Sequence, residues 1–378
     1  MCRFESGLGY LDDPQWSGGE NVEDERGERP LPSAPPPREL FADRVAVVVN
    51  GNAKQVTDDL VDILDQIVQS GDLFVSRSLA EANEIARTIV RRGYPTVLTG
   101  GGDGTFVQMV TRIVEEARRT GGKRPRFGLL RLGTGNALAW VLGAQSPRHR
   151  GVIADLGRLR REGGSRAMRL LEVEGTLTPF AGLGIDAIAL RDYNTTKAAL
   201  ASSPLTRPLS AGALAYLVSV VGRTMPTYLL RPHPRVRIVN EGETSSRLGQ
   251  DGRPVSEIAS GEVIYEGPSR MVAMSTIPYW GFGARIFPYA DERPDRFNLR
   301  VVDITSLDVA IHIRDIWKGT YRSDTVHDFL CERISIHYDE PMPMQIGGDS
   351  VGSRATVHAR LAPEPIEVVD YYAPPPHT

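Results

Sequence analysis

The sequence predicts two folded parts, an α/β part built on a parallel sheet and an antiparallel β-sandwich-like part after it. From residue 45 to about 130, short apolar runs alternate with stretches whose apolar residues recur at helical spacing. That alternation is typical of a parallel sheet covered by helices. From about Ala167 the chain changes to short β-rich runs separated by glycine and proline, which is typical of an antiparallel sandwich or barrel.

Composition sets the limits on function. A chain of 378 residues, 41% hydrophobic and 24% charged, can bury more than one core. The net charge of -3 and the absence of a basic run argue against a nucleic-acid partner. Only Cys2 and Cys331 are present, so a reducing compartment and a cytoplasmic location are expected. No apolar run reaches the roughly 20 residues of a membrane span, so we expect only peripheral membrane contact.

Four segments follow from these patterns. Residues 1–40 are proline-rich and polar, so we expect a flexible leader. Residues 41–165 form the α/β domain and residues 166–365 the β-rich domain. Residues 366–378 end in three prolines, which predicts a short extended C-terminal tail.

The α/β part is expected to begin with a strand at residues 45–49 and a helix through residues 60–68. Ser78 and Glu81 form a capping box for the next helix, and Gly93 is its C-terminal cap. A strand at 94–98, a glycine turn, a helix and a strand at 127–130 follow. In the β-rich part we expect two helices, around residues 211–222 and 307–317.

The turn at residues 101–105, Gly-Gly-Asp-Gly-Thr, is the most informative segment. Its glycines let the backbone approach an anion closely, so several N–H groups can converge on a phosphate near a helix N-terminus. Asp103 would lie beside that phosphate. A carboxylate is tolerable there if a metal ion or a proton to be removed offsets the repulsion, which indicates phosphoryl transfer. The alternative is a structural turn with Asp103 as a helix N-cap.

Two further segments suit the same chemistry. Asn50, Asn52 and Lys54 lie in the turn after the first strand, where two amides and a cation would face a nucleotide; an ordinary βα turn is the alternative. Residues 130–139 again run from a strand through a glycine turn into a helix start. Two glycine turns at neighbouring strand ends, separated by one helix, favour a shared phosphate site over two unrelated helix caps.

These residues resemble a known family. The Asn50-x-Asn52 turn, GGDGT at 101–105 and GTGNALA at 133–139 are similar to the catalytic domain of the diacylglycerol kinase and sphingosine kinase superfamily. Segments at 180–187, 212–217 and 345–349 resemble later family elements in the same order. The matches span roughly residues 43–365.

The resemblance implies an enzyme that transfers the γ-phosphate of ATP, with Mg²⁺, to a lipid hydroxyl. The α/β domain would bind the nucleotide, and the β-rich domain would bind a diacylglycerol, sphingoid base or ceramide-like lipid at a membrane surface. A homo-oligomer is compatible with the sequence.

The resemblance also implies roles for single residues. Asp103 and Asp349 would be catalytic and would hold magnesium through Mg-ATP, and Asp186 would meet the lipid headgroup. Asp103 would act either as a base or by orienting Mg-ATP. Helix capping explains Ser78 equally well, and a β-turn aspartate bound to its own backbone explains Asp186 equally well. The residues expected to bind ATP are Asn50, Asn52, Lys54, Ser78, Gly101, Gly102, Gly104, Thr105, Gly133, Thr134, Gly135 and Asn136.

The sequence departs from the family at one element. Where the family has Asp-Gly-Glu, this chain has Gly347-Gly348-Asp349, so the leading carboxylate is absent. Two alternatives therefore remain beside a lipid kinase. One is an NAD kinase-like enzyme, which shares GGDGT but for which residues 133–139 are unlike the expected Thr-Gly-Ser-Thr-Ala-Tyr type of segment. The other is a nucleotide- or lipid-binding family member without catalysis.

Overall fold

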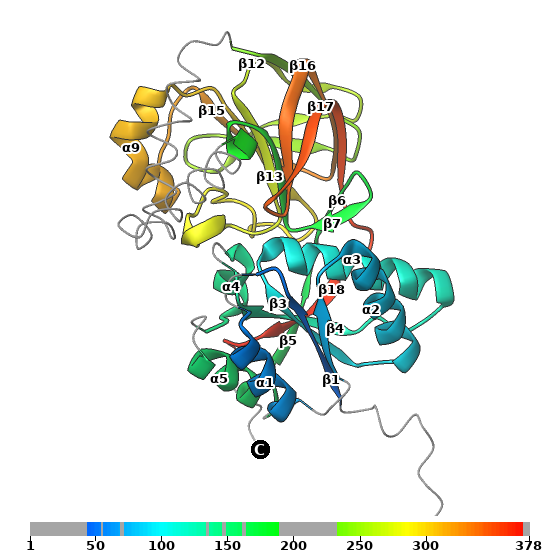
Figure 1. The fold of residues 1–378 in the computed structure, drawn as a ribbon. Coiled ribbons are helices and arrows are strands. Elements are labelled where there is room, and N and C mark those ends of the chain that lie inside the picture. The colour runs from blue at the N-terminus through cyan, green and yellow to red at the C-terminus, as the bar shows by residue number, and fades with distance from the viewer. Residues whose placement is uncertain are drawn as a thin grey trace, which may run out of the picture.

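The described residues form two folded parts, one on each side of helix α3 (Asp103–Thr120) (Figure 1). The computed structural model describes residues 44–53, 56–68, 72–133, 136–145, 149–160, 164–188 and 233–372. One part has a mainly parallel sheet with helices, and the other has a large antiparallel sheet, which confirms the predicted fold class. The expected leader and the helix expected at 211–222 lie outside the described residues, as do Lys54, Thr134 and Gly135.

The first sheet has six strands in the order β2-β1-β3-β4-β18-β5. All neighbouring strands pair in parallel except β5, which is an antiparallel edge strand. The interior strands are rich in valine and leucine because helices cover both faces. The strands are β1 (Val45–Asn50), β2 (Leu73–Ser76), β3 (Thr96–Gly101), β4 (Arg126–Arg131), β5 (Gly164–Met168) and β18 (Ile366–Asp370).

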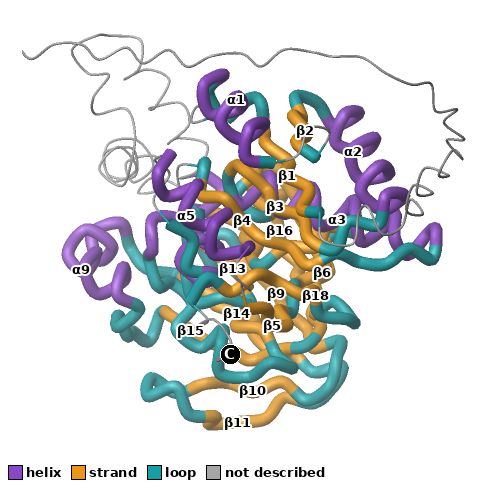
Figure 2. Tube along the Cα trace, turned by 90° about the horizontal axis from the view of Figure 1, so that it is seen from below, coloured by secondary structure: helices purple, strands orange, loops and turns teal. Residues whose placement is uncertain are grey.

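Helices α2 and α3 lie on one side of this sheet, and α1 and α5 lie on the other (Figure 2). This follows from right-handed crossovers, because the chain moves outward from β1 to β2 and then back across to β3 and β4. The helices are α1 (Asp58–Ile67), α2 (Leu79–Arg92), α3 (Asp103–Thr120), α4 (Ala137–Leu142) and α5 (His149–Arg160).

Helix α2 shows how local sequence sets the element boundaries. The Ser78 hydroxyl accepts a hydrogen bond from the Glu81 N–H, and Gly93 ends the helix in the left-handed conformation, both as predicted. The capping box is incomplete, however. The Glu81 carboxylate accepts from the N–H of Arg77 instead of that of Ser78.

The predicted C-terminal tail is wrong for its first residues. Residues 366–370 form β18, which pairs in parallel with β4 and antiparallel with β5 inside the first sheet. Val368 and Val369 are fully buried there. The β-rich domain also begins later than the predicted residue 166. Strand β5 (Gly164–Met168) still belongs to the first sheet, and the first strand of the second sheet begins at Leu171. The chain therefore returns to its first domain at its end.

The second part is a twelve-stranded antiparallel sheet. Its long strand β16 pairs with β9 near its start and with β8 near its end. It therefore connects the strands on the β9 side of the sheet with those on the β8 side, and both groups of strands contribute to one core. The strands are β6 (Leu171–Val173), β7 (Thr176–Thr178), β8 (Phe180–Gly184), β9 (Arg235–Asn240), β10 (Ser245–Leu248), β11 (Pro254–Ile258), β12 (Val263–Pro268), β13 (Met271–Ser275), β14 (Phe297–Val302), β15 (Val326–Cys331), β16 (Arg333–Ile346) and β17 (Asp349–Leu361).

Two helical segments accompany this sheet. Helix α9 (Ser306–Lys318) agrees with the helix predicted at 307–317 and begins with a capping box between Thr305 and Asp308. The short helix η4 (Gly281–Gly283) contacts α4 of the first part. There, the Trp140 ring packs against Tyr279, with 6.5 Å between ring centroids. Among the described residues, no helix is both long enough and apolar enough to cross a membrane.

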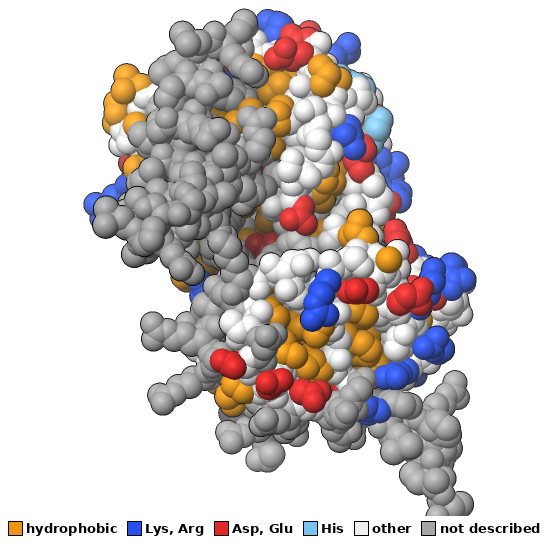
Figure 3. All heavy atoms as spheres, in the orientation of Figure 1, with side chains coloured by type: hydrophobic (Ala, Val, Ile, Leu, Met, Phe, Trp, Pro, Cys, Tyr) orange, Lys and Arg blue, Asp and Glu red, His pale blue; other side chains and the backbone are white. Residues whose placement is uncertain are grey.

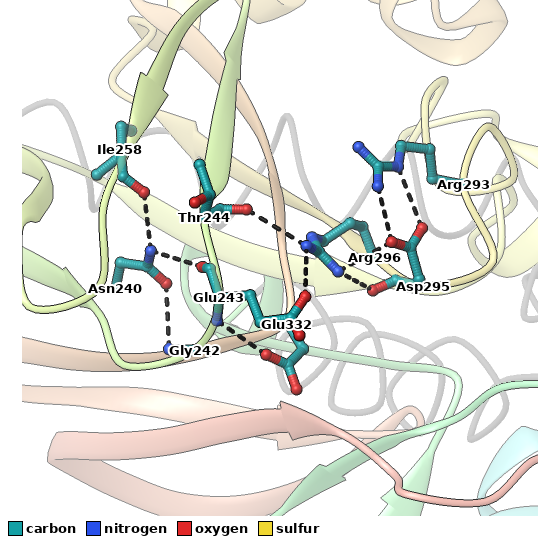
Figure 4. A network of polar contacts seen from close by, with 9 residues as sticks. All are labelled: Asn240, Gly242, Glu243, Thr244, Ile258, Arg293, Asp295, Arg296 and Glu332. Atoms are coloured by element: carbon teal, nitrogen blue, oxygen red, sulfur yellow. Dashed lines mark hydrogen bonds and ion pairs between the residues drawn. The ribbon is translucent and has the colours of Figure 1, made fainter.

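Two buried arginines of the second part are paired with carboxylates. Arg300 donates two hydrogen bonds of 2.8 Å to Asp328. Figure 4 shows a second network around Arg296, which donates to the Glu243 carboxylate and to Asp295. These pairs satisfy charges that would otherwise be costly to bury, so we assign them a structural role.

Helix α3 joins the two parts. Val107 packs in the core of the second part, although it belongs to a helix of the first. The Thr111 hydroxyl accepts a hydrogen bond of 3.0 Å from the N–H of Leu177 in β7. The helix that begins at the first glycine turn is therefore fixed by both parts.

Deleting residues 366–378 is expected to unfold the first part. The deletion removes four buried apolar side chains, Ile366, Val368, Val369 and Tyr371, each worth about 1.5–3 kcal/mol. That sum is comparable to the whole stability of a domain, about 5–15 kcal/mol. Thermal unfolding followed by circular dichroism measures the effect. Deleting only residues 373–378 is the control, and equal unfolding temperatures for the two truncated chains would contradict the assignment of β18.

Candidate active site

The two glycine turns are in direct contact. Each follows one of two neighbouring parallel strands, Gly102 after β3 and Gly133 after β4. A Cβ atom placed on Gly133 would lie 2.4 Å from the Cα of Gly102. Real Cβ atoms do not approach so closely, so any side chain at Gly133 would push the turns apart. The glycines are needed here for close approach of one backbone to another.

Asn136 is wedged between the two turns and is only 1% exposed. In the amide orientation that satisfies both neighbours, its nitrogen donates to the carbonyl of Gly101 and its oxygen accepts from the N–H of Gly133, each at 3.2 Å. Asn136 therefore links the first turn to the second. Thr134 and Gly135, which precede it, lie outside the described residues.

Asp103 is the N-terminal cap of α4, not of its own helix. Its two carboxylate oxygens accept hydrogen bonds from the N–H groups of Ala137 at 2.7 Å and Leu138 at 3.0 Å. The N-cap residues of α3 and α4, Gly102 and Asn136, make no side-chain cap bond themselves. Asp103, the first residue of α3, thus caps α4. This contact holds the glycine turn after β4 against the glycine turn after β3.

Burial dominates the electrostatics of Asp103. The side chain is 8% exposed, and burial raises its pKa from an ordinary value of 3.8 to about 6. The two backbone N–H bonds oppose that rise, and the nearby charge of Asp349 adds to it. Asp103 is therefore ionised at neutral pH but protonates more readily than a surface aspartate.

The Asn50 and Asn52 turn contacts the neighbouring elements. The Asn50 amide nitrogen lies 3.2 Å from the hydroxyl oxygen of Thr105 and donates to it, which joins the end of β1 to the first turn of α3. The exposed Asn52 donates to the carbonyl of Arg77. The Arg77 side chain packs beside Gly51, where a Cβ atom would meet its Cγ at 2.9 Å. Arg77 is exposed and places a cation at this edge of the sheet. We did not predict this residue from the sequence.

Asp349 reaches the first part from the second. It follows the two-residue turn Gly347-Gly348 between β16 and β17, and both glycines have positive φ, +58° and +87°. Such a type I′ turn favours glycine at both positions. A Cβ atom on Gly104 would lie 2.4 Å from the Asp349 carboxylate, so Gly104 leaves room for this acid beside the first turn of α3. Although the residue as a whole is exposed, burial of its carboxylate raises the pKa of Asp349.

Asp186 lies inside the second part. It is 3% exposed and accepts a hydrogen bond of 3.2 Å from the side chain of Gln345. Burial raises its pKa to about 7. The side chain is enclosed, and its hydrogen-bond partner Gln345 belongs to the same domain.

The donor set suits magnesium held together with ATP better than a metal held by protein alone. Within the described residues, no three His, Cys, Asp or Glu side chains gather into a possible metal site. Asp349 is an exposed carboxylate, whereas both oxygens of Asp103 are engaged by backbone N–H groups. Magnesium is commonly bound through one or two carboxylates plus substrate phosphates and water, and Asp349 would supply such a carboxylate if phosphates bound beside it.

Comparison with known proteins agrees with this arrangement. Residues 44–172 match the diacylglycerol kinase catalytic domain. A protein described as "Probable lipid kinase YegS-like" from Enterobacter sp. (strain 638) is 32% identical over 96 residues, which cover 24% of this chain and 31% of that relative. The chain thus matches less than a third of the length of this curated relative.

Solved structures share this fold over most of the chain. A putative diacylglycerol kinase from Bacillus anthracis str. Sterne has a TM-score of 0.58 and 15% identity, covering 86% of this chain and 96% of that one. A second structure from the same organism, described as a diacylglycerol kinase, has a TM-score of 0.59 and 15% identity, covering 87% and 97%. At such identities the likeness establishes the fold. The domain match and the glycine motifs in their expected order assign residues 44–172 to the diacylglycerol kinase catalytic domain family.

Proposed function

We propose that this protein transfers the γ-phosphate of ATP to the hydroxyl of a lipid. The observation that carries the proposal is the contact of the two glycine turns beside the N-terminus of α3, with the Asp349 carboxylate of the other domain beside the same helix turn. Phosphoryl transfer to an alcohol requires groups that position the phosphates, and a carboxylate near the acceptor hydroxyl assists it.

The phosphates would bind at the first turn of α3. The opening N–H groups of any α-helix lack partners within the helix and carry partial positive charge, which favours an anion. Gly101, Gly102, Gly104 and Thr105 surround this turn. Asn50, Asn52 and Arg77 lie at the neighbouring strand ends, so we assign the rest of the nucleotide to that edge. The other residues proposed for the ATP site from the sequence remain Lys54, Ser78, Gly133, Thr134, Gly135 and Asn136.

The two acids have different tasks in this proposal. Asp103 positions the second glycine turn, because both of its oxygens already hold the start of α4. Asp349 is exposed and would face the reacting groups, where it would receive the proton of the lipid hydroxyl or hold magnesium. Magnesium bound with ATP would supply charge neutralisation at the phosphates.

Asp349→Asn is expected to lower kcat for lipid phosphorylation by about 10²-fold or more, because the change removes the exposed carboxylate of the site. Purified protein, labelled ATP and a panel of diacylglycerol, a sphingoid base and ceramide provide the assay, with NAD as a separate acceptor. Ser350→Ala, an exposed neighbour in the same strand, is the matched control.

The acceptor panel separates the alternatives. A labelled lipid that depends on Asp349 supports the kinase. Phosphorylation of NAD without any lipid product would assign the chain to NAD kinase-like chemistry. ATP binding without transfer to any acceptor would identify a binding protein, and either result would overturn the proposal.

Asp103→Asn is expected to destabilise the protein by about 1–3 kcal/mol and to weaken ATP binding, because its NH₂ group would face a backbone N–H. Thermal unfolding and ATP titration measure the two effects. If this variant binds ATP and unfolds like the original chain but transfers no phosphate, Asp103 acts in the chemistry and the positioning role is wrong.

The same variant tests the pKa of Asp103. The unfolded chain releases this proton near pH 4 and the folded chain near pH 6, so the folded state binds more protons in that window. Stability from this group is therefore present below pH 4 and falls as the pH rises to about 6, by up to about 3 kcal/mol. Asp103→Asn should remove that part of the pH dependence.

The proposed lipid substrate requires access to a membrane, and we assign this contact to α9. Leu307 and Ile311 are 66% and 64% exposed, and the exposed cations Arg314 and Lys318 follow in the same helix. Apolar side chains gather at the edge where α9 lies (Figure 3). The N–H of Arg285 donates to the carbonyl of Trp317, which ties α9 to the segment that contacts α4. An apolar pair followed by a basic pair suits an anionic lipid surface.

Leu307→Gln with Ile311→Gln is expected to weaken binding to phosphatidylcholine vesicles, with or without phosphatidylglycerol, by about tenfold or more. Arg314→Gln with Lys318→Gln should weaken binding only to the anionic vesicles, since each cation near such a surface contributes about 1 kcal/mol. Cosedimentation measures both. Val255→Gln, equally exposed at 63% in β11, is the control, and an equal loss from this variant would contradict the assignment.

A further inference from the structure

A hydrogen-bonded path connects buried Asp186 to the turn that carries Asp349. The Gln345 side chain donates through Nε2 to Asp186 Oδ2 at 3.2 Å and accepts through Oε1 from the N–H of Gly348 at 2.9 Å. Asp186 and Gln345 are 3% and 2% exposed. The path therefore runs through the interior of the second domain and ends one residue before Asp349.

The direction of these bonds follows from chemistry. The backbone N–H of Gly348 is only a donor, so the Gln345 oxygen must face it. The Gln345 nitrogen then faces Asp186, which must accept. Asp186 can do so in either protonation state, because a neutral carboxylic acid keeps one accepting oxygen.

Space for this path is made at Gly182. A Cβ atom there would lie 2.0 Å from Asp186 Oδ2, so only glycine admits the acid. Gly182 of β8 is paired with Gln345 of β16, and Asp186 follows the end of β8 by two residues, which brings its carboxylate next to Gln345. The other carboxyl oxygen, Oδ1, is buried and has no hydrogen-bond partner in the part of the chain that the structure describes.

The turn needs support of this kind. Two consecutive glycines allow a type I′ turn but restrict the backbone less than any other pair, so ordering them costs more entropy. The N–H of Gly347 donates to the carbonyl of Phe180 at 3.0 Å, and the N–H of Gly348 donates to Gln345. These two bonds hold the turn to β8 and its neighbours.

We propose that Asp186 is a positioning residue for Asp349: by fixing Gln345 it holds the Gly347-Gly348 turn and so places the Asp349 carboxylate beside the first turn of α3. The inference rests on the proposed role of Asp349 in phosphoryl transfer. It replaces the expected contact of Asp186 with a lipid headgroup. The raised pKa of Asp186 agrees with it, because a largely neutral acid can be buried in this place at moderate cost.

Asp186→Leu is expected to lower kcat by about tenfold or more, with little change in KM for ATP or lipid, because Asp349 loses its position. Asp186→Asn keeps an accepting oxygen toward Gln345 and should retain kcat within about threefold. In an Asp349→Asn background, Asp186→Leu should have no further effect on kcat. If Asp186→Asn instead raises KM for lipid while kcat is kept, Asp186 meets the substrate and the proposal fails.

Hydrogen exchange at the Gly348 amide tests the path without any activity. This amide should be protected in the original chain and in Asp186→Asn, and should exchange faster in Asp186→Leu. Gln345→Met, which removes both bonds, should expose it as well and serves if Asp186→Leu does not fold. Unchanged exchange in these variants would refute the path even if the protein is a kinase, and a protected amide in a chain without kinase activity would refute only the proposed function.

Discussion

The contact between the backbones of Gly102 and Gly133 is the constraint on which the rest of the site depends. It brings the ends of β3 and β4 together, and it is possible only because neither turn carries a side chain at that point. Asp103 then stabilises the contact by capping α4 from the start of α3. One short-range contact thus aligns two helix N-termini at the same sheet edge, which is where parallel α/β sheets bind ligands.

The second domain contributes an exposed carboxylate to the candidate site. The first domain supplies glycine turns, and its most informative acid, Asp103, is buried and engaged by backbone N–H groups. The hairpin of β16 and β17 supplies an exposed acid, Asp349, and Gly104 leaves the space that this acid occupies. Because α3 packs into the cores of both domains, the cradle and the acid are held by one element. The site is therefore a property of the two domains together.

Local sequence predicted what local interactions determine. The caps of α2 at Ser78 and Gly93 and the fold class followed from patterns within a few residues. Long-range pairing could not be predicted in this way: residues 366–370 have an ordinary strand pattern, and nothing in it identifies β4 as the partner. The same holds for Asp103, bonded to amides 34 and 35 residues away, and for Asp186, whose partner is 159 residues away.

The missing carboxylate at position 347 has a steric cause in this chain. Gly347 has a φ of +58°, and a Cβ atom there would lie 2.5 Å from Val107 Cγ2, inside the contact between α3 and the second core. A side chain at this position would push the hairpin away from α3 and carry Asp349 with it. At position 347, where the family pattern has an acid, the backbone of this chain packs closely against Val107. Asp349 is therefore the carboxylate that the Gly347-Gly348-Asp349 segment provides. In the proposed reaction, with Asp349 as the exposed acid of this turn, positioning and charge neutralisation would account for most of the rate, as a loose phosphoryl-transfer transition state permits.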